Sequence, residues 1–516
     1  MIQRTSLITE TIWNLTLAAA LCLVLPAPLV AQAPPGQAQD TKTTPLSKVE
    51  RKNRAPVSKQ VLNVKLRRPV EARLDNGLTV LIMEDARFPV VSVQFYINGA
   101  GPIYEPADVP GLAAMTAQML REGTKTRTSR QIAEEVDKLG ATLSANSSFG
   151  SDAATVFASG LSDNFDQWFA LATDMLLNPS FPAEEWNKMK ERQKVGLRQQ
   201  RSQSFFLANE RFSRAVYGQH PAAVVSATLA SLDAMTPEML AKWHRERYVP
   251  QNAILAIAGD VRASALIPKL KTWLAGWQKT DLKVSPPPRP APASAKKIYL
   301  VDRPGSVQTT IAMGNIAIDR RDPDYIPLVV MNRVIGGGPA ARLFLNLREE
   351  KGYTYGVYSN FTAVKYPGPW RAGGDMRTEV TDGAMTEFLK EIRRIREENV
   401  PPAELDESKR SVVASFALSL ESPEQLLSYA ITRKIYDLPD DYWDTYPAKI
   451  MAVTAADVQR IAQKYLDPER LQIVAVGDAA KIKSVLEKYG PVEVYDMEGN
   501  PAAAKASAAT SSRTQE

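Results

Sequence analysis

Cysteine and histidine are almost absent from this sequence. Its 516 residues include one cysteine and two histidines. The lone cysteine, Cys22, excludes an internal disulfide framework, and it lies in an N-terminal apolar stretch that processing would remove. The remaining composition is typical of a globular protein, with 44% hydrophobic and 23% charged residues, and the chain is long enough to bury several cores.

Long apolar runs are equally scarce, and the N-terminal one covers residues 15–31. It has 17 residues, two of them prolines, whereas a membrane span needs about 20. Arg4 precedes the run and small residues follow it, so residues 1–33 predict a cleaved secretory signal and export to the periplasm of a Gram-negative-type bacterium. An uncleaved membrane anchor and a lipoprotein modified at Cys22 are the alternatives.

The chain also lacks a basic face. Its net charge is +6, but residues 42–68 alone contain nine Lys or Arg and one Glu, which leaves the remainder slightly acidic. This stretch belongs to a basic extended leader, residues 34–68, rich in Pro, Gln and Thr. We therefore expect no nucleic-acid partner. The leader is either a solvated linker or a weak contact with anionic lipid headgroups at a membrane surface.

Apolar periodicity predicts strands and helices in the first half of the chain. The predicted strands are residues 70–74, 78–83, 90–97, 140–148, 153–161 and 253–258. The predicted helices are residues 111–123, 129–139, 164–177, 182–203 and 232–248. In the last of these, Thr236, Pro237 and Glu238 supply a cap, a first-turn proline and an acidic residue that suits the helix dipole.

A proline-rich stretch, residues 282–296, divides the chain, because proline removes backbone donors and fixes φ. The second half then repeats the first. The repeat is carried by pairs of residues at a constant offset of 218, namely Thr236 and Thr454, Pro250 and Pro468, and Asp260 and Asp478. Constant spacing indicates a duplicated α+β unit of about 200 residues. We expect one unit at residues 69–281, the other at 297–492, and a disordered tail at 493–516.

The helix predicted over residues 111–123 resembles the zinc helix of the insulinase-like (M16) metallopeptidases. The resemblance includes residues 101–106 (GPIYEP) before it, and the Gly-Leu-Ala and Gly-Thr pieces at its ends. In that family the zinc motif is His-x-x-Glu-His. Here the first His, the Glu and the second His are replaced by Ala114, Ala117 and Gln118. Alanine has no lone pair to offer, a Gln amide is a poor zinc ligand, and Ala117 cannot serve as a general base.

The third ligand of the family is also missing. It is a glutamate roughly 75 residues past the second histidine. The matching window, residues 193–195, has no acid, and nearby Glu191 sits a little early. His220 is expected in a turn and His244 on a helix, so neither replaces a lost ligand. The resemblance implies two homologous M16-type α/β domains, each a roll of mixed sheet plus helices, in a pseudopeptidase that binds no metal and is not a peptidase by itself.

The second half is similar to the same family at another site. A glycine-rich turn and an Arg-Leu-Phe helix, residues 336–344, lead into residues 347–356 (LREEKGYTYG). In the family this segment carries an Arg and a Tyr that face the zinc site of the opposing half or subunit, here Arg348 and Tyr355. A guanidinium suits a peptide carbonyl or carboxylate, and a phenol can donate to a forming oxyanion. Alternatively, Arg348 pairs with a Glu on its own helix and Tyr355 is a core residue. Arg342 is expected to pack or cap, and the turn lacks the context of a nucleotide loop.

Three functions follow from these observations. The first is a zinc-less subunit of a heterodimeric exported M16 peptidase, which supplies Arg348 and Tyr355 to the zinc site of a homologous partner and helps to enclose an unfolded peptide. The second is a non-enzymatic peptide-binding or scaffold protein of the same fold, like the related core subunits of respiratory complexes. The third is an M16 zinc metallopeptidase with displaced ligands.

Overall fold

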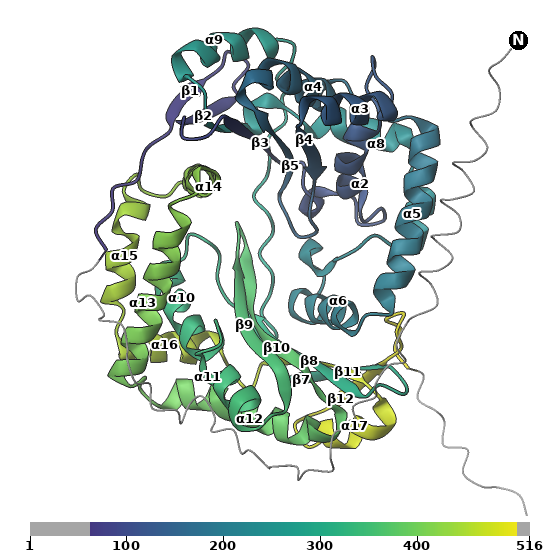
Figure 1. Cartoon of the computed structure of the whole chain (residues 1–516). Helices are drawn as coiled ribbons and strands as arrows, with labels where there is room; N and C mark the ends of the chain where they lie inside the picture. Colours follow the sequence, from purple (N-terminus) through teal and green to yellow (C-terminus); the bar gives the residue numbers. More distant parts are fainter. Residues whose placement is uncertain (1–61, 503–516) are drawn as a thin grey trace, which may run out of the picture. The chain divides into compact units, whose positions relative to one another are not determined.

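Two six-stranded mixed sheets organise the chain (Figure 1). The structure is a computed structural model that describes residues 62–502, so the predicted signal at residues 1–33 and most of the predicted leader lie outside it. The first sheet has the order β1-β2-β6-β3-β5-β4, and the second has the order β12-β7-β11-β8-β10-β9. Residues 282–296 contain no helix or strand and lie in the connection between the two sheets.

The strands of the first sheet are β1 (Val70–Arg73), β2 (Thr79–Glu84), β3 (Val90–Asn98), β4 (Thr142–Asn146), β5 (Ala153–Leu161) and β6 (Ala253–Gly259). The strands of the second are β7 (Lys297–Asp302), β8 (Gln308–Ile316), β9 (Thr354–Ala363), β10 (Pro367–Arg377), β11 (Gln472–Gly477) and β12 (Val492–Tyr495). All six strands that the sequence predicts in the first half are therefore present.

The helices before the connection are α2 (Leu112–Met119), α3 (Ser129–Leu139), α4 (Phe165–Leu177), α5 (Ala183–Arg201), α6 (Ser204–Tyr217), α7 (Leu229–Ala234), α8 (Pro237–Arg247) and α9 (Ala263–Trp273). Those after it are α10 (Tyr325–Ile335), α11 (Arg342–Phe344), α12 (Thr381–Glu397), α13 (Pro402–Ser419), α14 (Pro423–Ile435), α15 (Tyr442–Ala452), α16 (Ala455–Tyr465) and α17 (Ala479–Leu486).

The two sheets share one topology at five of their six positions. The order β2-β6-β3-β5-β4 corresponds to β7-β11-β8-β10-β9. In each sheet the first pair of neighbouring strands is parallel, and the three pairs that follow are antiparallel. The sixth strand differs, because β1 precedes β2 and runs antiparallel to it, whereas β12 comes from the end of the chain and runs parallel to β7. The duplicated α+β architecture expected from the repeat is confirmed.

Three helical segments of the first half depart from the prediction, and one of them is α9, which was not predicted. The helix predicted over residues 232–248 is split into α7 and α8, because Met235 and Thr236 are extended and the Thr236 hydroxyl accepts the Met239 N–H at the start of α8. A residue before proline avoids the helical region, which places the new start at Thr236. Helix α6 follows α5 after a two-residue break at Ser202 and Gln203 and was not predicted at all.

The tail is the clearest correction. Residues 493–516 were expected to be disordered, but β12 continues to Tyr495 and the Ala502 N–H donates to the Val494 carbonyl. Two arginines from the first half hold the turn that follows β12. The contacts are Arg201 Nη1 to the Met497 carbonyl at 2.8 Å and Arg211 Nη2 to the Gly499 carbonyl at 2.7 Å. Pairing with a distant strand and with these donors orders residues 493–502, and residues 503–516 lie outside the described part of the chain.

Each half of the chain contributes one helix to the sheet of the other half (Figure 1). In the second sheet, alternate residues of β7, β8 and β11 face α12 and its neighbours, and the residues between them face α6 from the first half. Helix α14 from the second half covers one face of β2 and β6 in the same way. The buried side chains under α14 are Leu81, Met83, Ala256 and Ala258, and those under α6 include Tyr299, Val301, Ala312, Val474 and Val476.

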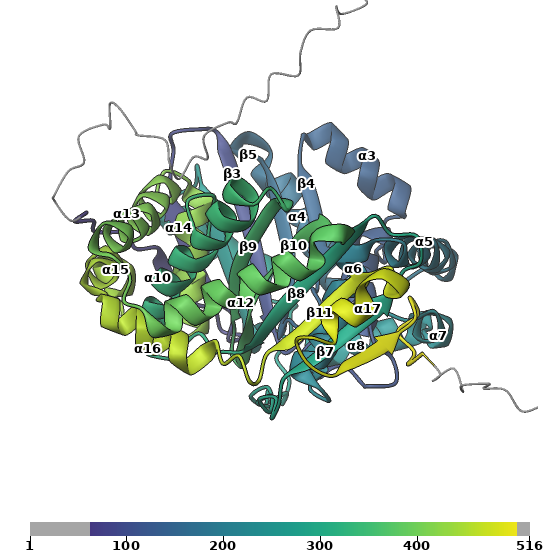
Figure 2. The same cartoon turned by 90° about the horizontal axis from the view of Figure 1, so that it is seen from below.

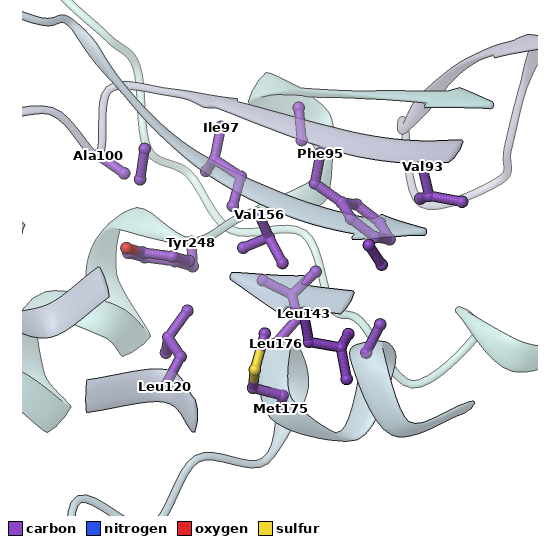
Figure 3. Packing of buried hydrophobic residues seen from close by; sticks show 14 of the residues in the cluster. Val93, Phe95, Ile97, Ala100, Leu120, Leu143, Val156, Met175, Leu176 and Tyr248 are labelled. Carbon is purple, nitrogen blue, oxygen red and sulfur yellow. The ribbon is translucent and has the colours of Figure 1, made fainter. Parts of the chain in front are cut away.

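The opposite face of the first sheet forms the largest core of that half (Figure 3). Phe95 and Ile97 of β3 and Val156 of β5 point toward Met175 and Leu176 of α4. Leu120, directly after α2, and Tyr248, directly after α8, close the same cluster. This core fixes the C-terminal end of α2 relative to the sheet.

The end of the predicted leader is held by the second half. Residues 62–68 contain no helix or strand, as expected, and Leu66 is buried against the second core. The Leu66 N–H donates to Asp444 Oδ1 at 2.9 Å, and Arg68 pairs with Asp444 Oδ2 at 2.6 Å. Within residues 62–502, none of the helices has the length and apolar character that a membrane crossing requires.

The exchange of helices predicts a stability effect. Leu207 of α6 is 2% exposed and packs among residues of the second sheet, so Leu207→Ala should lower the free energy of unfolding by about 3 kcal/mol. Phe205 lies on the same helix but is 67% exposed, and Phe205→Ala should change stability by less than about 1 kcal/mol. Thermal unfolding of both variants tests this, and equal midpoints would contradict the packing of α6 between the halves.

Candidate functional site

Helix α2 carries the positions that resemble the zinc motif. It begins after Gly111, whose φ of 98° lies in the left-handed region. The Glu105 carboxylate accepts the N–H of Gly111 at 2.8 Å and that of Ala113 at 3.0 Å, which satisfies two free donors at the helix N-terminus. Burial raises the pKa of Glu105 to about 7, although both hydrogen bonds oppose the shift. The α-helix ends at Met119 and a 3₁₀ turn, Leu120–Glu122, completes the predicted segment.

The degenerate zinc positions do not all face the same space. Ala114 and Gln118 line a cavity between the sheets, whereas Ala117 is fully buried. The Gln193 side chain on α5 donates from Nε2 to Gln118 Oε1 at 2.8 Å. The residue of α5 that contacts Gln118 is thus 75 positions beyond it, which is the spacing that the resemblance implies for the third ligand. This position is Gln193 rather than Glu191.

Glu191 is turned away from this place. Its carboxylate pairs with Lys194 Nζ at 3.1 Å, and Lys194 also pairs with Asp233 at 2.5 Å. The Glu191 side chain is 66% exposed in this arrangement. It is not positioned as a third ligand.

The donor set does not fit zinc. A catalytic zinc takes about three ligands from His, Cys, Asp or Glu. The three ligand positions here hold Ala114, Gln118 and Gln193, the position of the general base holds Ala117, and the two carboxamides bond to each other. Between residues 62 and 502, no group of three or more His, Cys, Asp or Glu side chains is placed to hold a metal ion.

Both histidines make structural hydrogen bonds. His220 Nδ1 accepts the Ala222 N–H at 3.1 Å, so Nε2 carries the proton that it donates to the Pro288 carbonyl at 2.9 Å. His220 thereby starts a 3₁₀ turn, Pro221–Ala223, and contacts the proline-rich connection. His244 Nε2 donates to the Leu176 carbonyl at 2.8 Å, and burial lowers the pKa of His244 to about 4.

The cavity between the sheets has a volume of about 950 Å³, at the upper end of the range for ligand pockets. Its lining mixes apolar side chains with uncharged polar ones. Six of them are carboxamides: Gln118, Asn146, Gln193, Gln200, Asn209 and Asn360. Two charged side chains also line it, Asp152 and Arg371. Asp152 accepts the Tyr96 hydroxyl at 2.9 Å and pairs with Lys365 at 2.6 Å.

Arg348 and Tyr355 lie away from this cavity. Arg348 belongs to a π-helical turn, Leu345–Glu350, where it pairs with Glu349 at 2.5 Å and its guanidinium lies 4.8 Å from the centre of the Phe344 ring. Tyr355 is in β9, the edge strand of the second sheet, and is 90% exposed. The pairing of Arg348 with a neighbouring Glu is present, and the placement of Tyr355 in a core is wrong.

No hydrogen bond or ring contact joins Arg348 to Tyr355 in the described part of the chain. Both side chains are nonetheless accessible, because 42% of the Arg348 side chain is exposed as well. Arg342 is different. Its guanidinium makes two bonds to Glu404, at 2.7 and 2.9 Å, and is buried. The expectation that Arg342 packs is therefore met.

The comparisons with known proteins agree with this fold. The profile described as Insulinase (Peptidase family M16) matches residues 79–223, and that described as Peptidase M16 inactive domain matches residues 234–412. The chain belongs to the M16 peptidase family. It is 23% identical to an uncharacterized zinc protease, YmxG, of Bacillus subtilis over 68% of this chain and 85% of that protein. An uncharacterized zinc protease of Rickettsia bellii is 24% identical, over 76% of this chain and 94% of that protein.

Solved structures show the same relationship. A peptidase M16 inactive domain from Pseudomonas fluorescens superimposes with a TM-score of 0.74 and 26% identity, covering 80% of this chain and 98% of that one. A protease from Helicobacter pylori superimposes with a TM-score of 0.73 and 18% identity, covering 79% and 99%.

The position of Gln193 predicts that a zinc site can be rebuilt. The triple variant Ala114→His, Gln118→His and Gln193→Glu restores three ligands at the two helices that already meet there. We expect it to bind one zinc ion per chain, measured by calorimetry and metal analysis, at least about tenfold more tightly than the histidine pair alone.

The matched control is the double variant Ala114→His and Gln118→His, which keeps Glu191 and Gln193. If Glu191 could supply the third ligand, the double and triple variants would bind zinc equally well. That result would contradict the placement of α5 against α2.

The environment of His244 predicts a pH dependence of stability. Its pKa is lowered by burial from 6.5 to about 4, so the unfolded chain takes up a proton at a higher pH than the native chain does. The stability that neutral His244 provides is complete above pH 6.5 and is lost as the pH falls toward 4. Relative to His244→Gln, which keeps a donor for the Leu176 carbonyl, the wild type should lose about 2 kcal/mol between pH 7 and 4.5.

Thermal unfolding midpoints of the two proteins across this range give the measurement. Groups common to both proteins, including Glu105, cancel in the difference. A difference that stays constant with pH would mean that His244 is not buried in the native chain.

Proposed function

We propose that this chain is the zinc-less subunit of a two-chain exported M16 peptidase. In this proposal a homologous partner carries the zinc and the general base. This chain presents Arg348 and Tyr355 to the partner's site and helps to enclose an unfolded peptide. Family membership, the loss of the ligand chemistry and the exposure of the second site support the proposal together.

The observation that carries the proposal is the contrast between the two sites. The zinc positions hold Ala114, Ala117, Gln118 and Gln193, and the two carboxamides are joined to each other. The segment that serves a zinc site in trans keeps its arginine and tyrosine, with Tyr355 90% exposed at a sheet edge. A subunit that supports a partner's chemistry needs the second set of residues and not the first.

The chemistry of the exposed residues suits this role. The guanidinium of Arg348 packs on the Phe344 ring, and 42% of the Arg348 side chain is exposed to solvent. Its rigid set of N–H donors can therefore bind a peptide carbonyl or carboxylate. The phenol of Tyr355 can donate a hydrogen bond to the oxyanion that forms when a peptide bond is attacked. Its position on an edge strand leaves it free to enter an interface with another chain.

The location of the proposed complex rests on the sequence. Residues 1–33 support export to the periplasm, and the basic residues at 42–68 support a weak contact with an anionic membrane surface. Both belong to the proposal, because residues 1–61 lie outside the part of the chain that the structure describes.

A second candidate is a peptide-binding or scaffold protein without any catalytic partner. The carboxamide-lined cavity favours it, because neutral donors and acceptors can pair with a peptide backbone without a metal. In that case Arg348 and Tyr355 would have no part in hydrolysis by any other chain.

The two candidates are separated by reconstitution. This chain is co-expressed with an exported homologue that has an intact His-x-x-Glu-His motif, and the purified pair is assayed on an unfolded peptide. We expect the chains to co-purify, and we expect Arg348→Ala or Tyr355→Phe to reduce kcat of the pair by about a hundredfold.

Tyr358→Phe is the matched control, because Tyr358 is on the same strand, is 47% exposed and contacts Phe344 through its ring. It should leave kcat within about twofold of the wild-type pair. Failure of the chains to associate, or full activity in both the Arg348 and the Tyr355 variants, would reject the catalytic-support role in favour of the second candidate.

A further inference from the structure

One arginine that lines the cavity, Arg371, is not part of the degenerate zinc site. Arg371 lies in β10, where Trp370 and Ala372 on either side of it are fully buried in the core of the second half. Successive residues of a strand point to opposite faces, so Arg371 points to the other face, and it lines the cavity together with Asn360, its partner on β9. The strand pairing therefore fixes the direction of the guanidinium.

The guanidinium is held in place by neutral groups. Its Nη1 donates to Asn209 Oδ1 at 2.9 Å. It also lies 5.2 Å from the centre of the Phe212 ring and 5.5 Å from that of Phe205. All three contacts come from α6, the helix that the first half contributes to the second sheet. Over residues 62–502, no carboxylate forms an ion pair with Arg371.

An arginine without a carboxylate partner carries a cost when it is partly buried, because water no longer solvates the charge fully. Burial lowers the pKa of Arg371, and no neighbouring acid offsets this shift. The other charged group of the lining, Asp152, is already paired with Lys365 at 2.6 Å. The cavity therefore has one unneutralised positive charge, supplied with several N–H donors.

We propose that Arg371 is the anion-recognition residue of this cavity and that its ligand is a carboxylate of a bound peptide. A guanidinium matches a carboxylate through two parallel N–H···O bonds. The carboxamides of the lining supply neutral donors and acceptors for the peptide backbone next to that carboxylate. The carboxylate comes either from the C-terminus of the peptide or from a glutamate side chain.

This site belongs to one chain only. Its residues come from both halves of the same chain, among them residues of α2, α5, α6 and the second sheet, and Arg348 and Tyr355 are not part of it. The inference therefore does not rest on the proposed partner, and it is tested on the purified chain alone. Failure of the co-expression experiment would leave it standing.

The experiment measures binding of fluorescein-labelled unstructured decapeptides by fluorescence anisotropy. Three probes are compared: a neutral peptide with a free C-terminal carboxylate, the same peptide with a C-terminal amide, and the amidated peptide with one internal glutamate. We expect at least one carboxylate-bearing probe to bind roughly tenfold more tightly than the neutral amide, and the stronger of the two identifies the source of the carboxylate.

Two variants test the role of Arg371 itself. Arg371→Gln removes the charge and should reduce the affinity for the preferred probe to that of the neutral amide. Asn209→Asp places a carboxylate on the present partner of Arg371, so it should compete with the ligand and weaken binding roughly tenfold while Arg371 is retained. If Arg371→Gln lost binding only because it misfolds, Asn209→Asp, which retains Arg371, would still bind the probe with wild-type affinity.

Arg377→Gln is the matched control. Arg377 is on the same strand, outside the cavity lining, and pairs at the surface with Glu379 at 3.4 Å. It should bind every probe as the wild type does. The proposal is overturned if the wild type binds none of the peptides, if it does not distinguish carboxylate from amide, or if Asn209→Asp and folded Arg371→Gln bind the carboxylate probe with wild-type affinity.

Discussion

The exchange of α6 and α14 between the halves is the constraint on which the rest of the structure depends. Each helix buries apolar side chains against a sheet formed by the other half of the sequence. Each sheet needs a cover on both faces, because the alternate residues of its central strands are apolar on both sides, and in each sheet a helix of the other half covers one of these faces. The same exchange brings Asn209 and Phe212 of α6 beside Arg371 of β10, and so it forms one wall of the cavity. Figure 2 shows α6 next to the second sheet.

Loss of the zinc ligands has left a stable local structure rather than a defect. Glu105 still caps α2, and the end of α2 still packs into the core through Leu120. Gln118 and Gln193 form a hydrogen bond with each other. A polar side chain on only one of the two helices would lack this partner. The scaffold of the family can therefore persist after the metal is lost, because the helices are held by packing and capping and not by the ion.

The sequence predicts short-range features of this fold well. Helix α3 has its predicted bounds because Thr128 and Gln131 form a reciprocal cap, and β5 has its predicted bounds because its residues alternate. The degenerate motif was found by resemblance to the M16 zinc helix, which a sequence can show because the positions lie within a few residues on one helix. Helix α6 was missed because its buried face meets strands that lie far away in the sequence, and the ordered segment 493–502 was missed for the same reason.

The candidate site shows the same limit. Spacing alone allowed the third-ligand position to be any residue from 191 to 195. In the structure the side of α5 that faces α2 carries Gln193, whereas Glu191 points away from α2. Arg371 carries no motif, and its significance depends on strand pairing that turns it into the cavity. It also depends on α6, whose one acid, Glu210, pairs with Arg201 and Arg214 and not with Arg371. Tyr355 was found by resemblance, whereas its exposure required the position of β9 at the sheet edge.

The central claim is that this chain has the fold of a metallopeptidase without its metal chemistry. The most direct measurement is the zinc content of the purified full chain, taken together with its hydrolysis of an unfolded peptide before and after treatment with a chelator. The account predicts less than stoichiometric zinc and no chelator-sensitive hydrolysis. One tightly bound zinc ion per chain, with hydrolysis that stops when the chelator is added, would contradict it.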